Sequence, residues 1–344
     1  MKIGLTYDLR SDYLASGFSE EETAEFDSEE TVSAIENALQ ENGFSTERIG
    51  NVFALVTSLA SGNRWDMVFN ITEGMFGASR EAQVPSLLEA YRIPVTFSDS
   101  LIISLTHSKP VAKELVRQMG IPTPDFAVIT TEEDCISNDL PPFPLFVKPV
   151  AEGTSKGIDE RSRVETAEDL SAVACELIGR YHQPVLVETF LPGREVTVGI
   201  TGTGSSARVA GVLEVCYREH TDHGIYSYRA KEFCEQLIDY RLATDRFADD
   251  AAEMALHIWR KLGCRDAGRI DFRADTNGMP CFLELNPLAG LHPTHSDLPI
   301  MWQLRGLRYT DLIGEIISSA LRRHRQRSES SRIDAFVVPR GHME

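Results

Sequence analysis

The first part of the chain alternates strand-like and helix-like stretches, and this order restricts the fold more than any other feature. Apolar runs predict strands at 1–7, 66–71 and 94–97. Apolar residues at helical spacing predict helices at 29–42 and 84–91. Because strands and helices alternate, we expect an α/β fold that begins with a parallel, Rossmann-like sheet covered by helices.

Two stretches of the same region lack a clear pattern. Residues 12–27 are acidic, contain serine and show weak periodicity, so we predict a mobile loop. Residues 51–64 allow no assignment to helix or strand.

The remaining patterns predict three domains and a tail. The N-terminal domain covers 1–103, the central domain 104–190 and the C-terminal domain 191–325, while the basic, serine-rich residues 326–344 are expected to be disordered. Helices are predicted at 109–119, 170–181, 247–262 and 309–321, and strands at 145–148, 185–188, 195–200, 209–215, 269–273 and 281–286.

Composition excludes several functional classes. The formal net charge of -18 argues against broad contact with a nucleic acid backbone, although local lysines can still attract a small anion. No apolar run approaches the roughly 20 residues needed to span a bilayer, so we expect no membrane partner and a cytoplasmic protein. The 6 cysteines lack CxxC spacing, which favours idle thiols over zinc or disulfides.

A lysine and a glycine-flanked hydroxyl loop form the first candidate site. Lys148 ends an apolar strand, and Glu152-Gly-Thr-Ser155 follows it. Backbone N–H groups with the Thr154 and Ser155 hydroxyls can surround phosphate oxygens, and Lys148 supplies a point charge. Lys156 lies on the loop itself and is expected to be solvated. The alternative is an ordinary turn with a surface lysine.

The second candidate site is a strand that leads into a Pro-Gly hinge. The backbone between Glu188 and Leu191 can present hydrogen-bonding groups to an adenine edge, and Glu195 can accept hydrogen bonds from ribose hydroxyls. A plain strand and turn with an exposed glutamate is the alternative.

The third candidate site combines two strands. Alternation places Arg269 and Asp271 on one face of the first strand, and Glu284 and Asn286 on one face of the second. If the strands are neighbours, carboxylate and amide oxygens converge, as Mg²⁺ held with substrate phosphates requires. Arg269 would then face developing negative charge. The alternative is a charged surface hairpin.

In their order along the chain, these segments resemble the ATP-grasp superfamily, and within it the D-alanine–D-alanine ligase family. The resemblance covers roughly residues 65–300 and implies a three-domain ATP-grasp fold. The matching stretches are Val68–Gly74, Leu87–Pro94, Ser108-Lys109, Val147–Pro149 with Glu152–Ser155, Val187-Glu188 with Gly193–Glu195, Tyr228–Lys231, Arg269–Asp271 and Glu284–Pro287.

The resemblance also implies roles for individual residues. Lys109 and Lys148 contact ATP phosphates, Thr154 and Ser155 belong to the loop over the γ-phosphate, and Lys231 lies on a mobile loop that closes the site. Glu152 and Gly153 complete the phosphate loop, Glu188 and Leu191 flank the adenine, and Glu195 holds the ribose. Asp271, Glu284 and Asn286 hold two Mg²⁺ ions, with Mn²⁺ as an alternative, while Arg269 and the backbone N–H near Gly290 stabilise the oxyanion.

The chain departs from the family pattern at both amino-acid subsites. Glu73 stands where the family usually has histidine, and Glu232 replaces the usual tyrosine after Lys231. His292, His295 and Ser296 lie where the family has a Thr/Ser-rich grip on the second substrate's carboxylate. A charged imidazole there would offset Asp297. A loop that only packs against the first domain is the alternative.

The resulting prediction is an ATP-dependent carboxylate–amine ligase that works through an acyl phosphate on small amino-acid-like substrates. Its amino-acid subsites are altered, with Glu73 favouring an ammonium group or a longer polar substrate. Two alternatives stay open: a true D-alanine–D-alanine ligase of cell-wall synthesis, and an inactive nucleotide-binding regulatory protein. The oligomeric state is open between a monomer and a homodimer.

Overall fold

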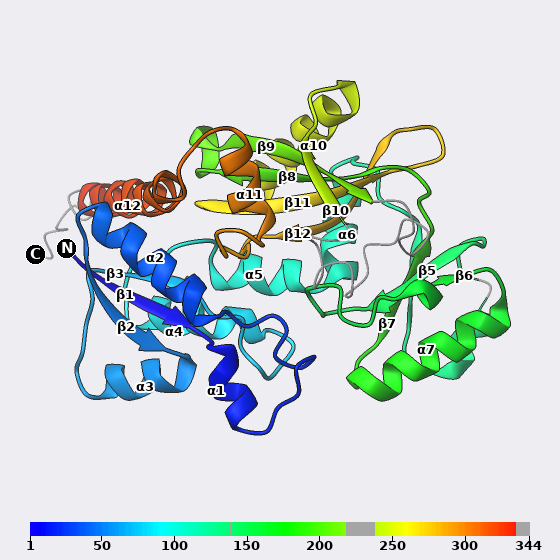
Figure 1. Cartoon of the computed structure of the whole chain (residues 1–344), viewed down its shortest axis with the longest axis horizontal. Coiled ribbons are helices and arrows are strands. Elements are labelled where there is room, and N and C mark those ends of the chain that lie inside the picture. The colour runs from blue at the N-terminus through cyan, green and yellow to red at the C-terminus, as the bar shows by residue number, and fades with distance from the viewer. Residues whose placement is uncertain (138, 218–237, 335–344) are drawn as a thin grey trace, which may run out of the picture.

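The computed structural model describes residues 1–137, 139–217 and 238–334, and contains three units, each with its own sheet (Figure 1). The first sheet has the order β2-β1-β3, with β1 at Lys2–Tyr7, β2 at Ser45–Gly50 and β3 at Met67–Ile71. Both strand pairs are parallel, so the parallel sheet predicted from the alternation of strands and helices is confirmed.

Helices α2 (Glu29–Glu41), α3 (Val52–Ala60) and α4 (Gln83–Ala90) cover this sheet. The predicted strand at 94–97 is wrong, because only an isolated bridge between Val68 and Val95 forms there. Strand β2 and helix α3 were not predicted. An edge strand with polar side chains lacks the apolar alternation that sequence analysis depends on.

The loop predicted at 12–27 is confirmed for residues 16–27, which form turns, and is wrong for residues 12–15, which belong to a helix. Helix α1 (Arg10–Ala15) opens the stretch, and the side chains of Thr23 and Phe26 are buried. Glu21 accepts a hydrogen bond from the Tyr181 hydroxyl at 2.5 Å, so the stretch also contacts the central unit. Its few anchoring side chains are too widely spaced to give a sequence period.

The central unit is an antiparallel sheet of order β4-β7-β5-β6, packed on α7 (Ala167–Tyr181). Its strands are β4 (Phe126–Ile129), β5 (Leu145–Pro149), β6 (Arg163–Val164) and β7 (Val185–Thr189). Helices α5 (Ser100–His107) and α6 (Lys109–Gln118) lead into it. The predicted domain boundary at 103/104 falls inside α5, because the apolar run there continues a helix from the N-cap Asp99.

The third unit is a five-stranded sheet of order β10-β9-β8-β11-β12 with antiparallel neighbours. It contains β8 (Glu195–Thr201), β9 (Arg208–Tyr217), β10 (Ile238–Leu242), β11 (Ala267–Ala274) and β12 (Pro280–Asn286), with α10 (Arg246–Leu262) and α11 (Asp297–Leu304).

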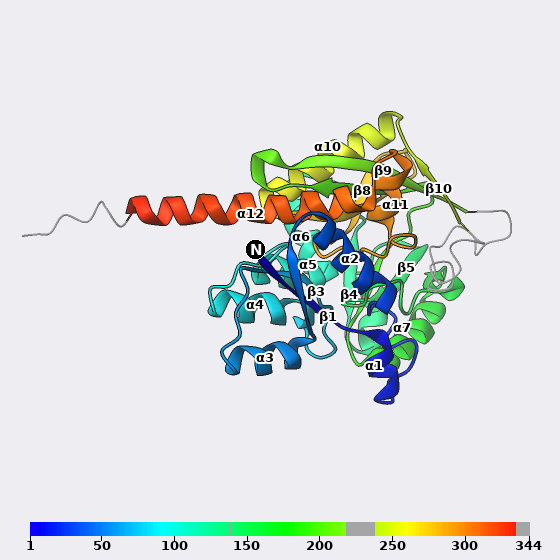
Figure 2. The same ribbon diagram turned by 60° about the vertical axis from the view of Figure 1, so that its left-hand side comes forward.

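The last helix, α12, extends over Tyr309–Asp334 and projects beyond the body of the molecule (Figure 2). The predicted disorder is therefore wrong for residues 326–334. Once packing has nucleated a helix, each further residue costs little, and arginine, glutamine and glutamate are good helix formers.

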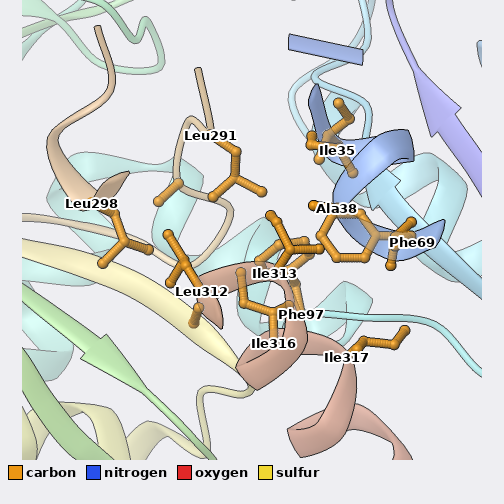
Figure 3. Close-up of a cluster of buried hydrophobic side chains, with 14 of the residues drawn as sticks. Ile35, Ala38, Phe69, Phe97, Leu291, Leu298, Leu312, Ile313, Ile316 and Ile317 are labelled. Carbon is orange, nitrogen blue, oxygen red and sulfur yellow. The ribbon is translucent and has the colours of Figure 1, made fainter. Parts of the chain in front are cut away.

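One hydrophobic core joins the first unit to the third (Figure 3). Ile313, Ile316 and Ile317 of α12 pack with Ile35 of α2 and with Leu291 from the loop after β12. This core fixes the loop that follows the metal-site strand relative to the first sheet. Among the described residues, no helix is long and apolar enough to cross a membrane.

Candidate active site

Strands β11 and β12 are antiparallel neighbours, as the third candidate site required. Asp271 lies directly opposite Glu284, and Arg269 lies opposite Asn286. The Asn286 amide nitrogen lies 3.4 Å from an oxygen of each carboxylate. From β8, the Thr197 hydroxyl donates to Asp271 at 2.8 Å. The predicted convergence of the carboxylates and the amide is confirmed, and the charged surface hairpin is excluded because Asp271 is buried.

The side chains of Arg269 and Lys109 offset the negative charge of these carboxylates. Arg269 donates to Asp271 at 2.5 Å and lies 3.5 Å from Asp297. The Lys109 ammonium lies 3.6 Å from Glu284. The oxygen donors of Asp271, Glu284 and Asn286 fit a hard divalent cation, because a rotated Asn286 amide would present its oxygen. Among the described residues, no three His, Cys, Asp or Glu side chains lie together in a way that could hold a metal ion. Phosphate oxygens and water would therefore have to complete the coordination of a metal bound here.

Glu188 is buried between two lysines. Its carboxylate lies 2.6 Å from the Lys148 ammonium and 2.7 Å from that of Lys113. Burial lowers the pKa of Lys113 to about 8, against the raising effect of Glu188. Burial alone would raise the pKa of Glu188, but Lys113 and Lys148 lower it. Sequence analysis missed Lys113, whose only signal was a lysine on the apolar face of α6.

The phosphate loop follows β5. Lys109 donates from its ammonium to the Glu152 carbonyl at 2.6 Å, which ties the start of α6 to the loop. Thr154 and Ser155 have φ angles of 50° and 56°, a conformation that costs free energy and is concentrated in ligand-binding loops. The prediction that Lys156 is solvated is wrong: its side chain is 7% exposed and its ammonium lies 2.5 Å from Glu152.

Glu25, from the stretch predicted as a loop, reaches this phosphate loop. Its carboxylate accepts a hydrogen bond from the Gly153 N–H at 2.5 Å, and it lies 3.0 Å from Arg80 and 3.5 Å from Lys156. Burial alone would raise the pKa of Glu25, but Arg80 and Lys156 lower it to about 2. Arg80 also donates to His107 at 2.9 Å.

Two adjoining cavities bring the predicted residues together. One is bounded by apolar side chains suited to a flat ring, namely Phe146, Ile158, Leu191 and Leu283. Glu195 lines its edge and lies 3.0 Å from Arg273. It is also lined by Lys109, Lys148, Glu152, Gly153, Ser155, Glu188, Arg269, Asp271 and Glu284. Sequence analysis did not identify Ile158 or Leu283, because neither differs from a core residue in type.

The larger cavity has a volume of about 530 Å³, within the range of small-molecule sites. It shares Lys109, Glu152, Gly153, Arg269 and Glu284 with the first cavity, so the two are continuous. The remaining predicted residues that line it are Glu73, Thr154, Asn286, Gly290, His292, His295 and Ser296. Of the predicted site residues, Lys231 lies outside the described residues, as does Glu232.

The loop after β12 forms one wall of this cavity. The His292 and His295 rings lie 4.5 Å apart, and the His292 N–H donates to the Ser296 hydroxyl at 2.9 Å. Burial, and then His295, lower the pKa of His292, so its imidazole is neutral near pH 7. Arg269 lies 3.5 Å from Asp297 and offsets its negative charge.

Comparison with known proteins defines the family. The family described as D-ala D-ala ligase C-terminus matches residues 115–318. A D-alanine–D-alanine ligase from Aquifex aeolicus is 33% identical over 74% of this chain and 82% of that protein. The chain belongs to the D-alanine–D-alanine ligase family. The predicted class, an ATP-dependent ligase that forms a carbon–nitrogen bond, is confirmed at this level.

A further relative and two solved structures are also similar to this chain. Uncharacterized protein y4sG of Sinorhizobium fredii is 32% identical over 75% of both chains. A Bacillus anthracis D-alanine–D-alanine ligase structure complexed with ATP has a TM-score of 0.72 at 20% identity, covering 95% of this chain and 99% of that one. The VanG D-Ala:D-Ser ligase from Enterococcus faecalis has a TM-score of 0.68 at 21% identity, covering 93% and 99%. These similarities confirm the ATP-grasp fold.

Proposed function

We propose that this ligase activates an amino-acid carboxylate with ATP and joins it to an amine, and that its amino-acid subsites differ from those for D-alanine. The observation that carries the proposal is the group formed by Asp271, Glu284 and Asn286 beside Lys109 and Arg269, at the junction of the two cavities. The adjoining apolar slot would take the adenine.

Two bond exchanges account for the reaction. A carboxylate oxygen of the first substrate attacks the γ-phosphorus, and the bond to ADP breaks, which gives an acyl phosphate. The amine of the second substrate then attacks the acyl carbon, loses a proton, and expels phosphate. Lys109, Lys148 and Arg269 would offset negative charge, and the backbone N–H near Gly290 would stabilise the oxyanion.

Asp271, Glu284 and Asn286 would hold the Mg²⁺ ions, two by resemblance, with Mn²⁺ as an alternative. Magnesium, when bound, neutralises charge on the phosphates. Glu188 would contribute its backbone to adenine recognition, since its carboxylate is already engaged by Lys113 and Lys148. Lys231 is proposed to contact ATP from the loop that closes the site.

Transfer of ¹⁸O tests the acyl phosphate. With a substrate labelled in its carboxylate, ATP and Mg²⁺, the released phosphate should carry one ¹⁸O, and a Glu284→Gln variant should release none. Unlabelled phosphate alongside product would overturn the proposed chemistry. ATP binding without turnover on pooled amino acids and amines would favour the regulatory alternative.

A further inference from the structure

The first-unit side of the larger cavity holds more negative groups than its cations offset. Asp27, at the end of the stretch after α1, and Glu73, just after β3, both line the cavity. Within the described part of the chain, neither side chain has a lysine or arginine at ion-pair distance. Glu73 also makes no side-chain hydrogen bond there, while Thr31 lowers the pKa of Asp27.

Neighbouring carboxylates on the same side differ, because each has a partner. Glu25 is held by Arg80 at 3.0 Å and Lys156 at 3.5 Å. Glu81 accepts a hydrogen bond from His107 at 2.6 Å. Arg10 pairs with Glu20, and Arg80 and Lys156 both pair with Glu25. Among the residues that the structure describes, no cation on this wall therefore forms an ion pair with Asp27 or Glu73.

The surroundings of Asp27 and Glu73 disfavour negative charge on both groups. Burial, followed by Glu81, Glu25 and Asp27, raises the pKa of Glu73 well above its usual range, against the lowering effect of Arg80. Burial and Asp8 raise the pKa of Asp27 to about 8. A bound cation would stabilise both carboxylates, because it supplies the opposite charge that the protein lacks there.

We infer that the first amino-acid subsite takes an amino acid whose side chain carries a second ammonium group, bound between Asp27 and Glu73. This inference rests on the proposed function. A neutral amino acid brings one ammonium group, whereas two carboxyl groups without cationic partners line this wall. The substrate carboxylate would lie at the opposite, basic side, near Lys109 and Arg269, where the phosphate loop adjoins the cavity.

The chemistry of Glu73 and the size of the cavity support the same inference. Glu73 presents a carboxyl group to the cavity beside Asp27. A carboxylate selects for a cation and against a neutral side chain of the same length. The cavity volume of about 530 Å³ leaves room for a side chain longer than a methyl group.

Calorimetry of the full chain with Mg²⁺ and a non-hydrolysable ATP analogue tests the inference. Both enantiomers of ornithine and lysine are compared with norvaline and norleucine, which are similar in length and lack the second ammonium. The better enantiomer of ornithine or lysine should bind roughly tenfold to a hundredfold more tightly than its neutral counterpart. Glu73→Gln and Asp27→Asn should each remove most of that preference, and Glu73→His should shift it toward neutral amino acids.

Glu114→Gln is the matched control, since Glu114 is an exposed carboxylate on α6 paired with Arg117. It should leave the preference unchanged. Equal binding of the charged and neutral amino acids by the unaltered protein would overturn the inference. Phosphate release on neutral amino acids in that preparation would then leave the ligase proposal standing. If no amino acid supports phosphate release, the ligase proposal fails. The inference about the subsite is still decided by whether the protein binds charged amino acids more tightly than neutral ones, and by whether Glu73→Gln removes that difference.

Discussion

The Glu25 carboxylate accepts a hydrogen bond from the Gly153 N–H at 2.5 Å, which joins the stretch after α1 to the phosphate loop. Glu25 also lies 3.0 Å from Arg80, so a first-unit cation and a central-unit loop share one buried carboxylate. The phosphate loop is therefore ordered partly by a residue from outside the central unit.

We expect Glu25→Gln to destabilise the fold by about 2–4 kcal/mol, because it leaves the buried Arg80 without its closest carboxylate. Glu21→Gln is the control, since Glu21 pairs with the half-exposed Arg180 and should cost less. The pKa of Glu25 lies near 2, below its usual range, so its contribution is present above about pH 4.5 and is lost as the pH falls toward 2. Urea unfolding at several pH values measures both effects; equal losses for the two variants would contradict the assignment.

Glu284→Gln should abolish turnover and keep the fold. Loss of a residue that only supports a metal ligand already costs about 10- to 100-fold, so loss of a ligand should cost more. Phosphate release at increasing Mg²⁺ measures the effect, and unchanged thermal unfolding verifies the fold. Near-normal phosphate release would show that Glu284 holds no metal.

Lys148→Ala and Lys156→Ala should affect different properties, namely nucleotide binding and stability. The sequence predicts that Lys148 matters far more for nucleotide binding, since Lys156 was expected to be solvated. Because Lys156 is buried against Glu152 and Glu25, its replacement should lower stability by about 1–3 kcal/mol and loosen the phosphate loop. Lys148→Ala should chiefly weaken nucleotide binding, measured by titration. Lys261→Ala, at an exposed position on α10, is the control and should change neither.

D-alanine should be a poor second substrate. The His292 and His295 rings line the wall where the resemblance implies small hydroxyl side chains, and burial lowers the pKa of His292. A competition assay with D-alanine, L-amino acids and small amines, read by mass spectrometry, should yield products other than D-Ala–D-Ala. Dominant D-Ala–D-Ala would favour the alternative in which Leu291 anchors a loop that only packs against the first unit.

Binding of a dibasic amino acid should strengthen as pH rises from about 6 to 8. The charged groups facing Glu73 are Glu81, Glu25, Asp27 and Arg80, and Asp8 acts on Asp27. Because the pKa values of Glu73 and Asp27 are raised, binding of a cation must displace their protons. The free energy needed to remove these protons falls as the pH rises. Calorimetry in buffers of different ionisation enthalpy should detect proton release, which the double variant Asp27→Asn, Glu73→Gln should lose.

The sequence alone determined the parallel first sheet, the loop after β5 that is proposed to bind phosphate, and the strands β11 and β12 that are proposed to hold the metal. These features depend on periodicity and on spacing within a few residues, which the chain carries locally. The alternation of side chains along a strand placed Arg269 and Asp271 on one face, and Glu284 and Asn286 on one face. The tertiary structure then had to show only that the two strands are neighbours.

Only the tertiary structure decided which distant charges meet. Glu25 lies 128 positions from Gly153 in the sequence, and the residues around each of them give no sign of this contact. Lys156 was expected to be solvated, and Lys113 was not identified at all, until packing buried them against Glu152 and Glu188. Burial and long-range charge pairing depend on how the three units pack together, which no local spacing encodes. Among the described residues, the same packing places Asp27 and Glu73 in one cavity without an ion-pair partner, and this imbalance supports the substrate class that we propose.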